Sequence, residues 1–473
     1  MASTPDAVVV GAGPNGLAAA ILLASAGRRV VVYEAGETIG GGCRSAALTL
    51  PGFVHDICSA VHPMAAASPF FRTLPLAAHG LEWIEPPAMV AHPLDEAAAA
   101  MVERSVERTA ARLPGDELNY RRLVGSVAAA WPMIDDAVLG PPRWPRHPLA
   151  LALFGLKALR SAERLALTGF AGVRARALFA GIGAHAMLPL DRFPTGAVGL
   201  VLAATAHTVG WVFPRGGSQR LANALAGYLE SLGGTIVTNA TVTSVQELPK
   251  AAAVLCDLSP RPFLRIAGSL LPDWYRRKLE RYRYGVAAYK VDWALDAPVP
   301  WRDGACANAG TVHIGGTLEE IAAAERDAWN GREPSRPFIL FSQPSLFDDT
   351  RAPRGRHTAW GYCHVPHGST ADMLPRIEEQ IERFAPGFRE RVLARQVMTP
   401  ADIERHNPNL VGGDIAAGVT DLGQWVTRPT WRGYSTPVKG LYLCSAATPP
   451  GVGVHGMCGY FAAKRALKET LRE

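Results

Sequence analysis

The chain has 473 residues, with 48 Lys and Arg against 42 Asp and Glu, which gives a net charge of +6. Hydrophobic residues make up 48% and charged residues 19%, so the composition excludes an intrinsically disordered protein. The length predicts two or three substructures. Seven scattered cysteines without a CxxC pair favour neither a disulfide framework nor a metal site.

The most specific pattern lies in residues 7–35. It predicts a strand, a tight turn, a helix and a second strand that is followed directly by an acidic residue. An apolar run leads into Gly11-x-Gly13-x-x-Gly16, and a second apolar run ends on Glu34. The glycines let backbone approach a pyrophosphate, and the helix start offers free N–H groups to it. Glu34, eighteen residues after Gly16, can bind a ribose hydroxyl and would repel a 2′-phosphate, which argues against NADP. The motif alone leaves NAD and FAD open.

A basic stretch carries the whole charge excess of the chain. Residues 141–180 hold seven Lys and Arg against Glu163 alone, and apolar runs at 148–159 and 164–170 are interleaved with them. Two interpretations stay open: a membrane-surface element through 143–176, and a solvated helical lid with a basic outer face. Nucleic acid is not an expected partner, because no nucleic-acid motif is present.

No stretch reaches the roughly 18 apolar residues that span a bilayer, and the sequence MASTPD lacks the features of a secretory signal. We therefore expect a cytoplasmic protein, with peripheral contact at the membrane surface as the open alternative.

The remaining patterns predict further elements in chain order. They are a glycine-rich turn at 36–45, a helical region at 96–190, a helix at 219–234, a strand pair at 235–248, strands at 251–257, 286–296 and 357–366, a helix at 375–396, a strand at 441–444 and a helix from about 454. The first and last segments are both strand–loop–helix units, so we expect them side by side in one sheet.

Several of these segments together resemble the FAD-dependent amine oxidase and phytoene desaturase superfamily, and within it the phytoene-dehydrogenase-related branch. The matching segments are residues 11–35, 40–45, 213–217, 233–245, 289–295, 360–366, 407–415 and 440–456. The resemblance implies an α/β fold with a Rossmann-type, glutathione-reductase-like FAD-binding domain, an inserted mixed-sheet substrate domain and a helical subdomain.

The domain boundaries that follow are discontinuous. The FAD-binding domain is expected to comprise residues 1–75, 212–285 and 436–473. The substrate domain would comprise residues 76–100, 191–211 and 286–435, and the helical, membrane-facing subdomain residues 101–190.

The resemblance also assigns cofactor contacts to matching positions. The expected FAD-binding residues are Gly11, Gly13, Pro14, Asn15 and Gly16 at the pyrophosphate, Glu34 and Ala35 at the ribose, Gly41, Gly42 and Arg44 at phosphate or ribitol, Val242 at the adenine, Ser445 and Ala446 at pyrophosphate and ribitol, and Gly453 and Val454 at the start of a helix toward the isoalloxazine. Relatives have a Gly-Ala-Gly-Thr type sequence where this chain has Ser-Ala-Ala-Thr at 445–448, which puts flavin affinity in question.

The activity implied is hydride transfer from a hydrophobic, isoprenoid or lipid-like substrate to the flavin. With no second GxGxxG unit, reduced flavin must give its electrons to oxygen or a quinone. His455 and Lys290 are the catalytic candidates, each with a structural role as the alternative. His55, Asp56 and His62 are interpreted as structural.

Trp360 and Tyr362 are interpreted as cavity wall or core. Three competing functions stay open: a flavin amine oxidase, a redox-neutral polyene isomerase, and a membrane-associated interaction protein with weakened catalysis.

Overall fold

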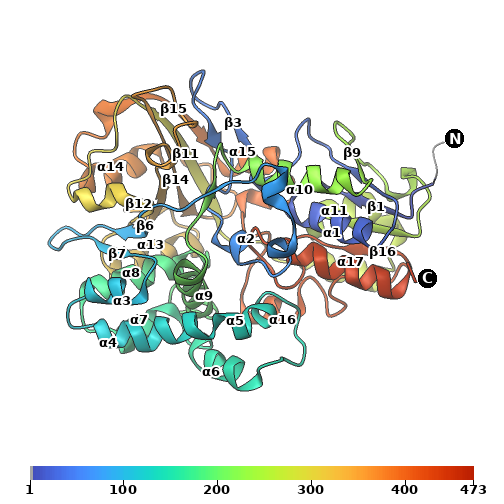
Figure 1. The fold of residues 1–473 in the computed structure, drawn as a ribbon, viewed down its shortest axis with the longest axis horizontal. Helices are drawn as coiled ribbons and strands as arrows, with labels where there is room; N and C mark the ends of the chain where they lie inside the picture. The colour runs from blue at the N-terminus through green and yellow to red at the C-terminus, as the bar shows by residue number, and fades with distance from the viewer. Residues whose placement is uncertain (1–3, 473) are drawn as a thin grey trace.

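The computed structural model describes residues 4–472, and two β-sheets organise it (Figure 1). The first sheet is parallel throughout and lies on the right of the view. Its strands, in spatial order, are β16 (Leu441–Leu443), β10 (Ala253–Cys256), β1 (Ala7–Val10), β2 (Val30–Tyr33) and β9 (Thr235–Val237). The central strands are short apolar runs because helices and loops cover both faces of the sheet.

Three helices pack together on this sheet: α1 (Pro14–Ser25), α10 (Gln219–Ser231) and α17 (Met457–Glu469). Helix α1 is rich in Ala and Leu and almost wholly buried between its neighbours. A Cβ atom on Gly459 would overlap the backbone oxygen of Asn15, so glycine is what lets α17 pack against the first turn of α1. The starts of both helices therefore meet at one edge of the sheet.

The second sheet has seven strands and mixed direction. In spatial order they are β15 (Val392–Met398), β11 (Ala287–Leu295), β14 (His357–Val365), β13 (Ile339–Ser342), β12 (Ala309–Ile314), β6 (Ala88–His92) and β7 (Ala100–Val102). Neighbouring strands pair antiparallel, except that β12 and β6 are parallel.

The two faces of this sheet differ in chemistry. On the outer face, Val291, Trp293 and Phe341 share one apolar core with Ile377 of α14 (Leu374–Phe384). On the inner face the alternate positions carry polar and aromatic groups: Lys290, Asp292, Trp360, Tyr362, His364, Ser342, Thr311, His313 and His92. Side chains alternate between the two faces of a strand. In the segment YKVDWAL, Tyr, Val and Trp therefore lie on the outer face and Lys and Asp on the inner face.

A layer of helices covers part of the inner face and forms the lower left of Figure 1. Its main members are α5 (Ser126–Val138), α6 (Pro148–Ala158), α7 (Ala162–Gly169), α8 (Val173–Ala184) and α9 (Thr195–Thr208). Helix α6 is apolar yet lies at the surface, with Leu149, Leu153 and Leu156 exposed by 72%, 56% and 67%. Within residues 4–472, no helix is long and apolar enough to cross a bilayer.

Shorter elements connect these layers. They are helices α2 (Pro63–Ala67), α3 (Val106–Ala111), α4 (Glu117–Tyr120), α11 (Pro260–Ala267), α12 (Asp273–Glu280), α13 (Leu318–Trp329), α15 (Pro400–His406) and α16 (Leu422–Thr427), and strands β3 (Ser45–Ala46), β4 (His55–Asp56), β5 (Trp83–Ile84) and β8 (Phe213–Pro214).

The predicted α/β fold class is confirmed, while several local predictions are wrong. The strand pair at 235–248 is β9 followed by a loop, because Asn239 takes a positive φ of 51° and β9 is the edge of its sheet. The helix at 375–396 ends at Phe384, and the chain then forms β15. The predicted helical region from 96 includes a strand, β7, because its apolar residues pair with β6.

Candidate functional site

The glycine loop between β1 and α1 has the geometry that its sequence predicts. Gly11 has φ +100°, which favours glycine, and a Cβ on Gly16 would overlap the backbone oxygen of Gly11. Gly41, with φ +54°, brings the second glycine turn against the first, since its Cβ would lie 3.2 Å from Gly13 Cα. Pro14 begins the helix, and Gly42 lies in the adjoining turn. The two glycine segments therefore form one surface of bare backbone.

Glu34 is 7% exposed and binds the loop itself. One carboxylate oxygen accepts from Ala12 N at 2.8 Å, and the other accepts from Gly36 N and Arg44 Nη2, both at 2.9 Å. Ala35, beside it, is exposed. Glu34 thus fixes the loop and the arginine relative to each other.

Two buried polar atoms at this loop lack a protein partner: Asn15 Oδ1, an acceptor, and Arg44 Nε, a donor. Buried polar atoms are normally hydrogen-bonded. Arg44 Nε can donate to a phosphate oxygen, whereas Asn15 Oδ1 can accept only from a donor. Together with the bare glycine backbone and the start of α1, the free Arg44 donor fits a phosphate-bearing dinucleotide such as FAD.

The loop before α17 holds the remaining predicted cofactor contacts. Ser445 Oγ donates to the Leu258 carbonyl at 2.8 Å and accepts from Ala447 N, so the small residues of this turn are held against β10. Gly453 has φ +133°, and Val454 is half-buried.

The prediction that the last helix begins near Val454 is wrong, because α17 begins at Met457. His455 Nδ1 accepts the Met457 N–H at 3.0 Å and so caps the helix from outside. Burial lowers the pKa of His455 to about 4, so its ring is neutral near pH 7. This geometry gives His455 a structural position at the start of α17.

Val242 lies in the loop after β9 and packs on the apolar cluster that contains Val10 and Cys256. The backbone of the same loop contacts the acid turn, since Ala240 N donates to the Glu34 carbonyl at 2.9 Å. The loop therefore borders the ribose side of the motif without being a strand.

Lys290 is buried on the inner face of the seven-stranded sheet, with 3% exposure, and pairs with Asp292 two residues along β11. His55 Nδ1 of β4 lies 3.5 Å from Asp292 Oδ1, and Thr49 Oγ1 lies 2.8 Å from His55 Nε2. Burial raises the pKa of Asp292 to about 6 and lowers the pKa of His55 to about 3. At pH 7 the cluster is therefore a Lys–Asp ion pair beside a neutral imidazole.

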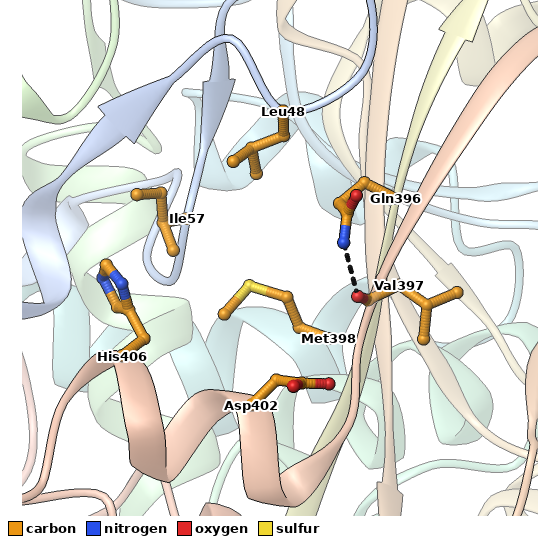
Figure 2. A pocket seen from close by; sticks show the side chains of 7 residues that line it. All are labelled: Leu48, Ile57, Gln396, Val397, Met398, Asp402 and His406. Atoms are coloured by element: carbon orange, nitrogen blue, oxygen red, sulfur yellow. Dashed lines mark hydrogen bonds between the residues drawn. The ribbon is translucent and has the colours of Figure 1, made fainter.

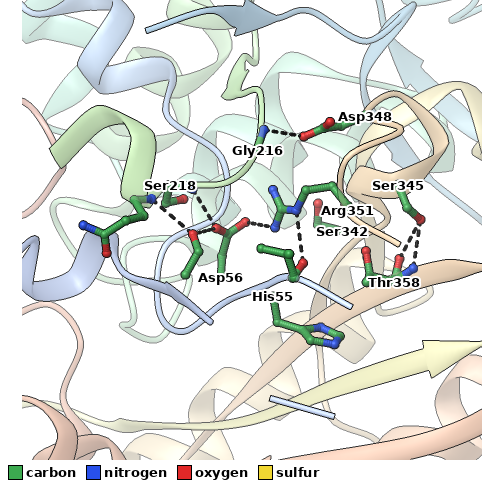
Figure 3. A network of polar contacts seen from close by, with 12 residues as sticks. His55, Asp56, Gly216, Ser218, Ser342, Ser345, Asp348, Arg351 and Thr358 are labelled. Carbon is green, nitrogen blue, oxygen red and sulfur yellow. Dashed lines mark hydrogen bonds and ion pairs between the residues drawn. The ribbon is translucent and has the colours of Figure 1, made fainter. Parts of the chain in front are cut away.

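Next to this cluster, a second buried ion pair joins β4 to the loop between β13 and β14 (Figure 3). Asp56 accepts from Arg351 Nη2 at 2.6 Å, from Ser218 N at 2.7 Å and from Ser45 Oγ at 2.7 Å. His62 Nε2 contacts Ser218 Oγ at 2.8 Å. These contacts fix β3 and β4, the start of α10 and the loop that carries Arg351 relative to one another.

Figure 2 shows a cavity of about 240 Å³ between β15, α15 and the β3–β4 segment. Its lining residues are Leu48, Ile57, Gln396, Val397, Met398, Asp402 and His406. Met398 and Gln396 are the cross-strand neighbours of Lys290 and Asp292. The cavity therefore borders the buried ion pair from the edge of the sheet.

Aromatic rings flank Lys290 on its other side. Trp360 and Tyr362 of β14 lie opposite Asp292 and Lys290, with their ring centroids 5.3 Å apart, and Lys290 Nζ is 5.7 Å from the Trp360 centroid. Tyr362 keeps partial exposure although its strand neighbours are buried. Its ring thus borders accessible space inside the molecule.

Sequence reasoning missed Asp292, Asp257 and the buried histidines of the inner face. The only available signal for Asp292 was its spacing of two from Lys290, which places both on one face of a strand. His185 Nε2 lies 3.0 Å from His313 Nε2, and the His92 and His313 rings are 6.4 Å apart. His185 follows the end of α8, His313 lies in β12 and His92 in β6, and nothing in their sequence spacing links them.

Comparisons with known proteins agree with this architecture. Residues 9–74 match the model of the NAD(P)-binding Rossmann-like domain. The Mus musculus pyridine nucleotide-disulfide oxidoreductase domain-containing protein 2 is 27% identical over 98% of this chain and 93% of its own length. The Streptomyces griseus phytoene dehydrogenase is 27% identical over 97% of this chain and 94% of its own.

A solved structure of wild-type putrescine oxidase bound to putrescine superposes with a TM-score of 0.62 at 17% identity, covering 99% of both chains. It shares the fold. Together with the full-length relatives and the paired glycine turns, it supports one interpretation. The chain is similar to FAD-dependent oxidoreductases of the amine oxidase and phytoene desaturase superfamily.

Proposed function

We propose that this flavoenzyme takes a hydride from a hydrophobic, isoprenoid or lipid-like substrate. The observation that carries the proposal is α6, an apolar helix that exposes Leu149, Leu153 and Leu156 on the helical layer next to the inner face. Exposed apolar patches mark contacts with lipid, ligand or protein. The phytoene dehydrogenase similarity supports the same substrate class.

We assign FAD to the surface between the two glycine turns and the start of α17. Gly11, Gly13, Pro14, Asn15 and Gly16 would hold the pyrophosphate, with Glu34 and Ala35 at the ribose, Val242 near the adenine, Gly41, Gly42, Arg44, Ser445 and Ala446 along the ribitol, and Gly453 and Val454 beside the ring. The unpartnered Arg44 Nε, a donor, supports this assignment.

When bound, FAD supplies the hydride acceptor. Lys290 is a positively charged residue on the inner face of the seven-stranded sheet. Asp292 pairs with its ammonium group and holds it in place. We propose that the Lys290 side chain orients substrate or a bound water and that the surrounding rings and strands exclude bulk solvent. With His455 engaged at the start of α17, Lys290 is the stronger catalytic candidate.

Anaerobic mixing of purified holoprotein with phytoene in detergent micelles tests the substrate class. We expect bleaching of the oxidised flavin absorbance, slowed at least about tenfold in Lys290→Met, which removes a positioned charge. Lys464→Met, on the outer surface of α17, is the control and should react as wild type. Bound FAD that no polyene or lipid reduces would contradict the proposal. Mixing the reduced protein with oxygen or a quinone then identifies the acceptor.

We further propose that α6 lies on an anionic lipid surface. Four of the seven cations in 141–180 bind groups of the protein: Arg143, Lys157, Arg174 and Arg176. Arg146, Arg160 and Arg164 are exposed around the leucines. The outward face of α6 itself is apolar rather than basic, which favours a helix lying in the interface over a solvated lid.

Flotation with vesicles containing phosphatidylglycerol tests this contact. Replacing Leu149, Leu153 and Leu156 together with Ser should abolish flotation and change the free energy of unfolding by less than about 0.5 kcal/mol per site. Replacing the exposed Arg164 with Gln should weaken flotation by a smaller factor. Adding salt to the wild-type protein should weaken flotation in the same way, because salt screens exposed charges. Flotation that survives the triple change would contradict the role of α6.

A flavin amine oxidase is the second candidate, and the Trp360–Tyr362 pair beside Lys290 favours it. Reduction of the flavin by putrescine or a monoamine, and by no polyene, would replace the first proposal. Turnover of the bound polyene without flavin bleaching would indicate an isomerase. Steady-state turnover of any substrate would exclude a purely structural interaction protein.

A further inference from the structure

The carboxylate of Asp257 lies at the mouth of the glycine loop. Strand β10 ends at Cys256 and runs parallel to β1, so residue 257 and the loop begin at the same edge of the sheet. Asp257 Oδ2 accepts a hydrogen bond of 3.0 Å from the backbone N–H of Gly16. A Cβ atom on Gly13 would lie 2.7 Å from the same oxygen. One donor at the start of α1 is thus already taken by an acid.

This placement conflicts with a doubly charged pyrophosphate. The start of a helix stabilises a nearby anion, but Asp257 already accepts one of its N–H groups. Asp257 is only 9% exposed, so water screens its charge poorly. Glu34 adds a second buried carboxylate on the other side of the loop, bonded to Ala12 N. An ionised Asp257, Glu34 and a pyrophosphate in one buried site would repel one another strongly.

We propose that Asp257 is a cofactor-binding residue that acts in its neutral form: FAD binding draws one proton onto this carboxyl group, which then donates a hydrogen bond to a pyrophosphate oxygen. The inference rests on the proposed FAD site. The proton comes from solvent and returns to it when FAD leaves, so no other reactant is involved.

The surroundings of Asp257 support proton uptake near neutral pH. Burial raises its pKa to about 7, the Gly16 N–H opposes that rise, and the charge on Glu34 adds to it. The nearest polar group from the loop after α15 is Asn409 Nδ2, which donates to the Asp257 backbone carbonyl at 2.9 Å. Three buried thiols with raised pKa also face it and stay neutral: Cys256, Cys444 and Cys458.

A bound pyrophosphate favours the protonated acid further, which fixes the sign of the pH effect. Above the pKa of free Asp257, each rise in pH makes the proton harder to acquire and FAD binding weaker. The affinity should fall by up to about tenfold per pH unit there and level off below it. An amide at this position needs no proton and removes the dependence.

The experiment measures the Kd of FAD for apoprotein by flavin fluorescence from about pH 6 to about pH 9. We expect the wild-type Kd to rise with pH. Asp257→Asn should be nearly flat and bind FAD at least about tenfold more tightly at the alkaline end. Calorimetry in buffers of different ionisation enthalpy should show proton uptake on binding in wild type and none in the variant.

The matched control is Asp116→Asn. Asp116 is also buried, at 2% exposure, and accepts backbone N–H groups from Ala171 and Gly172 at 2.8 and 2.7 Å, but it lies in the helical layer. Its variant should keep the wild-type pH dependence. If Asp257→Asn fails to fold, Asp257→Ser is measured in its place.

An identical pH slope in wild type and the Asp257 variants, or FAD binding without proton uptake, would overturn the role of Asp257 and leave the FAD site intact. A wild-type chain that binds no FAD at any pH would overturn the site itself and this inference with it.

Discussion

The two faces of the seven-stranded sheet are made by the same strands but differ in chemistry. On the outer face, alternate residues such as Val291, Trp293 and Phe341 pack into a continuous apolar core under α14. On the inner face, Lys290 and Asp292 are equally buried yet ionic. Burying charge disfavours folding unless the charges are paired, and even a paired set is seldom more stable than an apolar one.

The difference separates residues kept for stability from residues kept for chemistry. An apolar inner face would fold as well or better, so its lysine, acids and histidines mark the side on which we propose that the reaction takes place. Three measurements test that division.

The largest loss of stability is expected on the outer face. Trp293→Ala leaves a cavity among Phe341 and Phe388 and removes the Nε1–H bond to Glu378 Oε1 of 3.1 Å. The free energy of unfolding in urea should fall by about 3–5 kcal/mol. Flavin binding should persist in the folded fraction. A fall of less than about 1 kcal/mol would show that this face is not the main core of the sheet.

A contrast between two variants is expected on the inner face. Asp292→Ala leaves the Lys290 ammonium buried without its partner, and should lower the free energy of unfolding by about 3 kcal/mol. The double variant Lys290→Met with Asp292→Leu removes both charges and should be as stable as wild type or more stable. Flavin reduction by substrate should be lost in the double variant. Equal destabilisation in both would show that the ion pair is structural.

The smallest effect is a pH dependence to which the buried histidines of the inner face contribute. Burial lowers the pKa of His92 to about 4 and of His185 to about 3. The unfolded chain therefore binds protons first as pH falls below about 6.5, and stability declines by at most about 1.4 kcal/mol per pH unit for each histidine.

Unfolding curves at about pH 7 and about pH 5 measure this decline. His92→Phe should reduce the difference between the two curves. His147→Phe, at an exposed position, should leave it unchanged. An undiminished acid loss in His92→Phe would assign the effect to other groups.

The sequence predicted the nucleotide unit well because its constraints are local. Gly11 and Gly16 serve a backbone turn and a helix contact within a few residues, and the structure shows both. Glu34 was predicted to bind a ribose hydroxyl; in the structure it accepts the Ala12 N–H, and its predicted role stays untested. The strands with clear alternation, such as 286–296, were also predicted close to their bounds.

The rest depends on contacts that no local pattern carries. His55 meets Asp292, and His185 meets His313, only after the two sheets and the helical layer have packed. The start of α17 at Met457 likewise depends on a hydrogen bond from the Met457 N–H to His455 Nδ1. Helix propensity near Val454 carries no information about that bond. The predicted roles of the cofactor residues remain predictions until FAD binding is measured.

The contact between Gly459 and Asn15 also bears on the order in which the chain folds. These residues lie nearly the whole described length apart, yet α1 is covered only when α17 packs on it. During translation α1 is made early and α17 last, and such long-range contacts form slowly. We therefore expect the contact between Gly459 and Asn15 to be among the last to form as the chain folds.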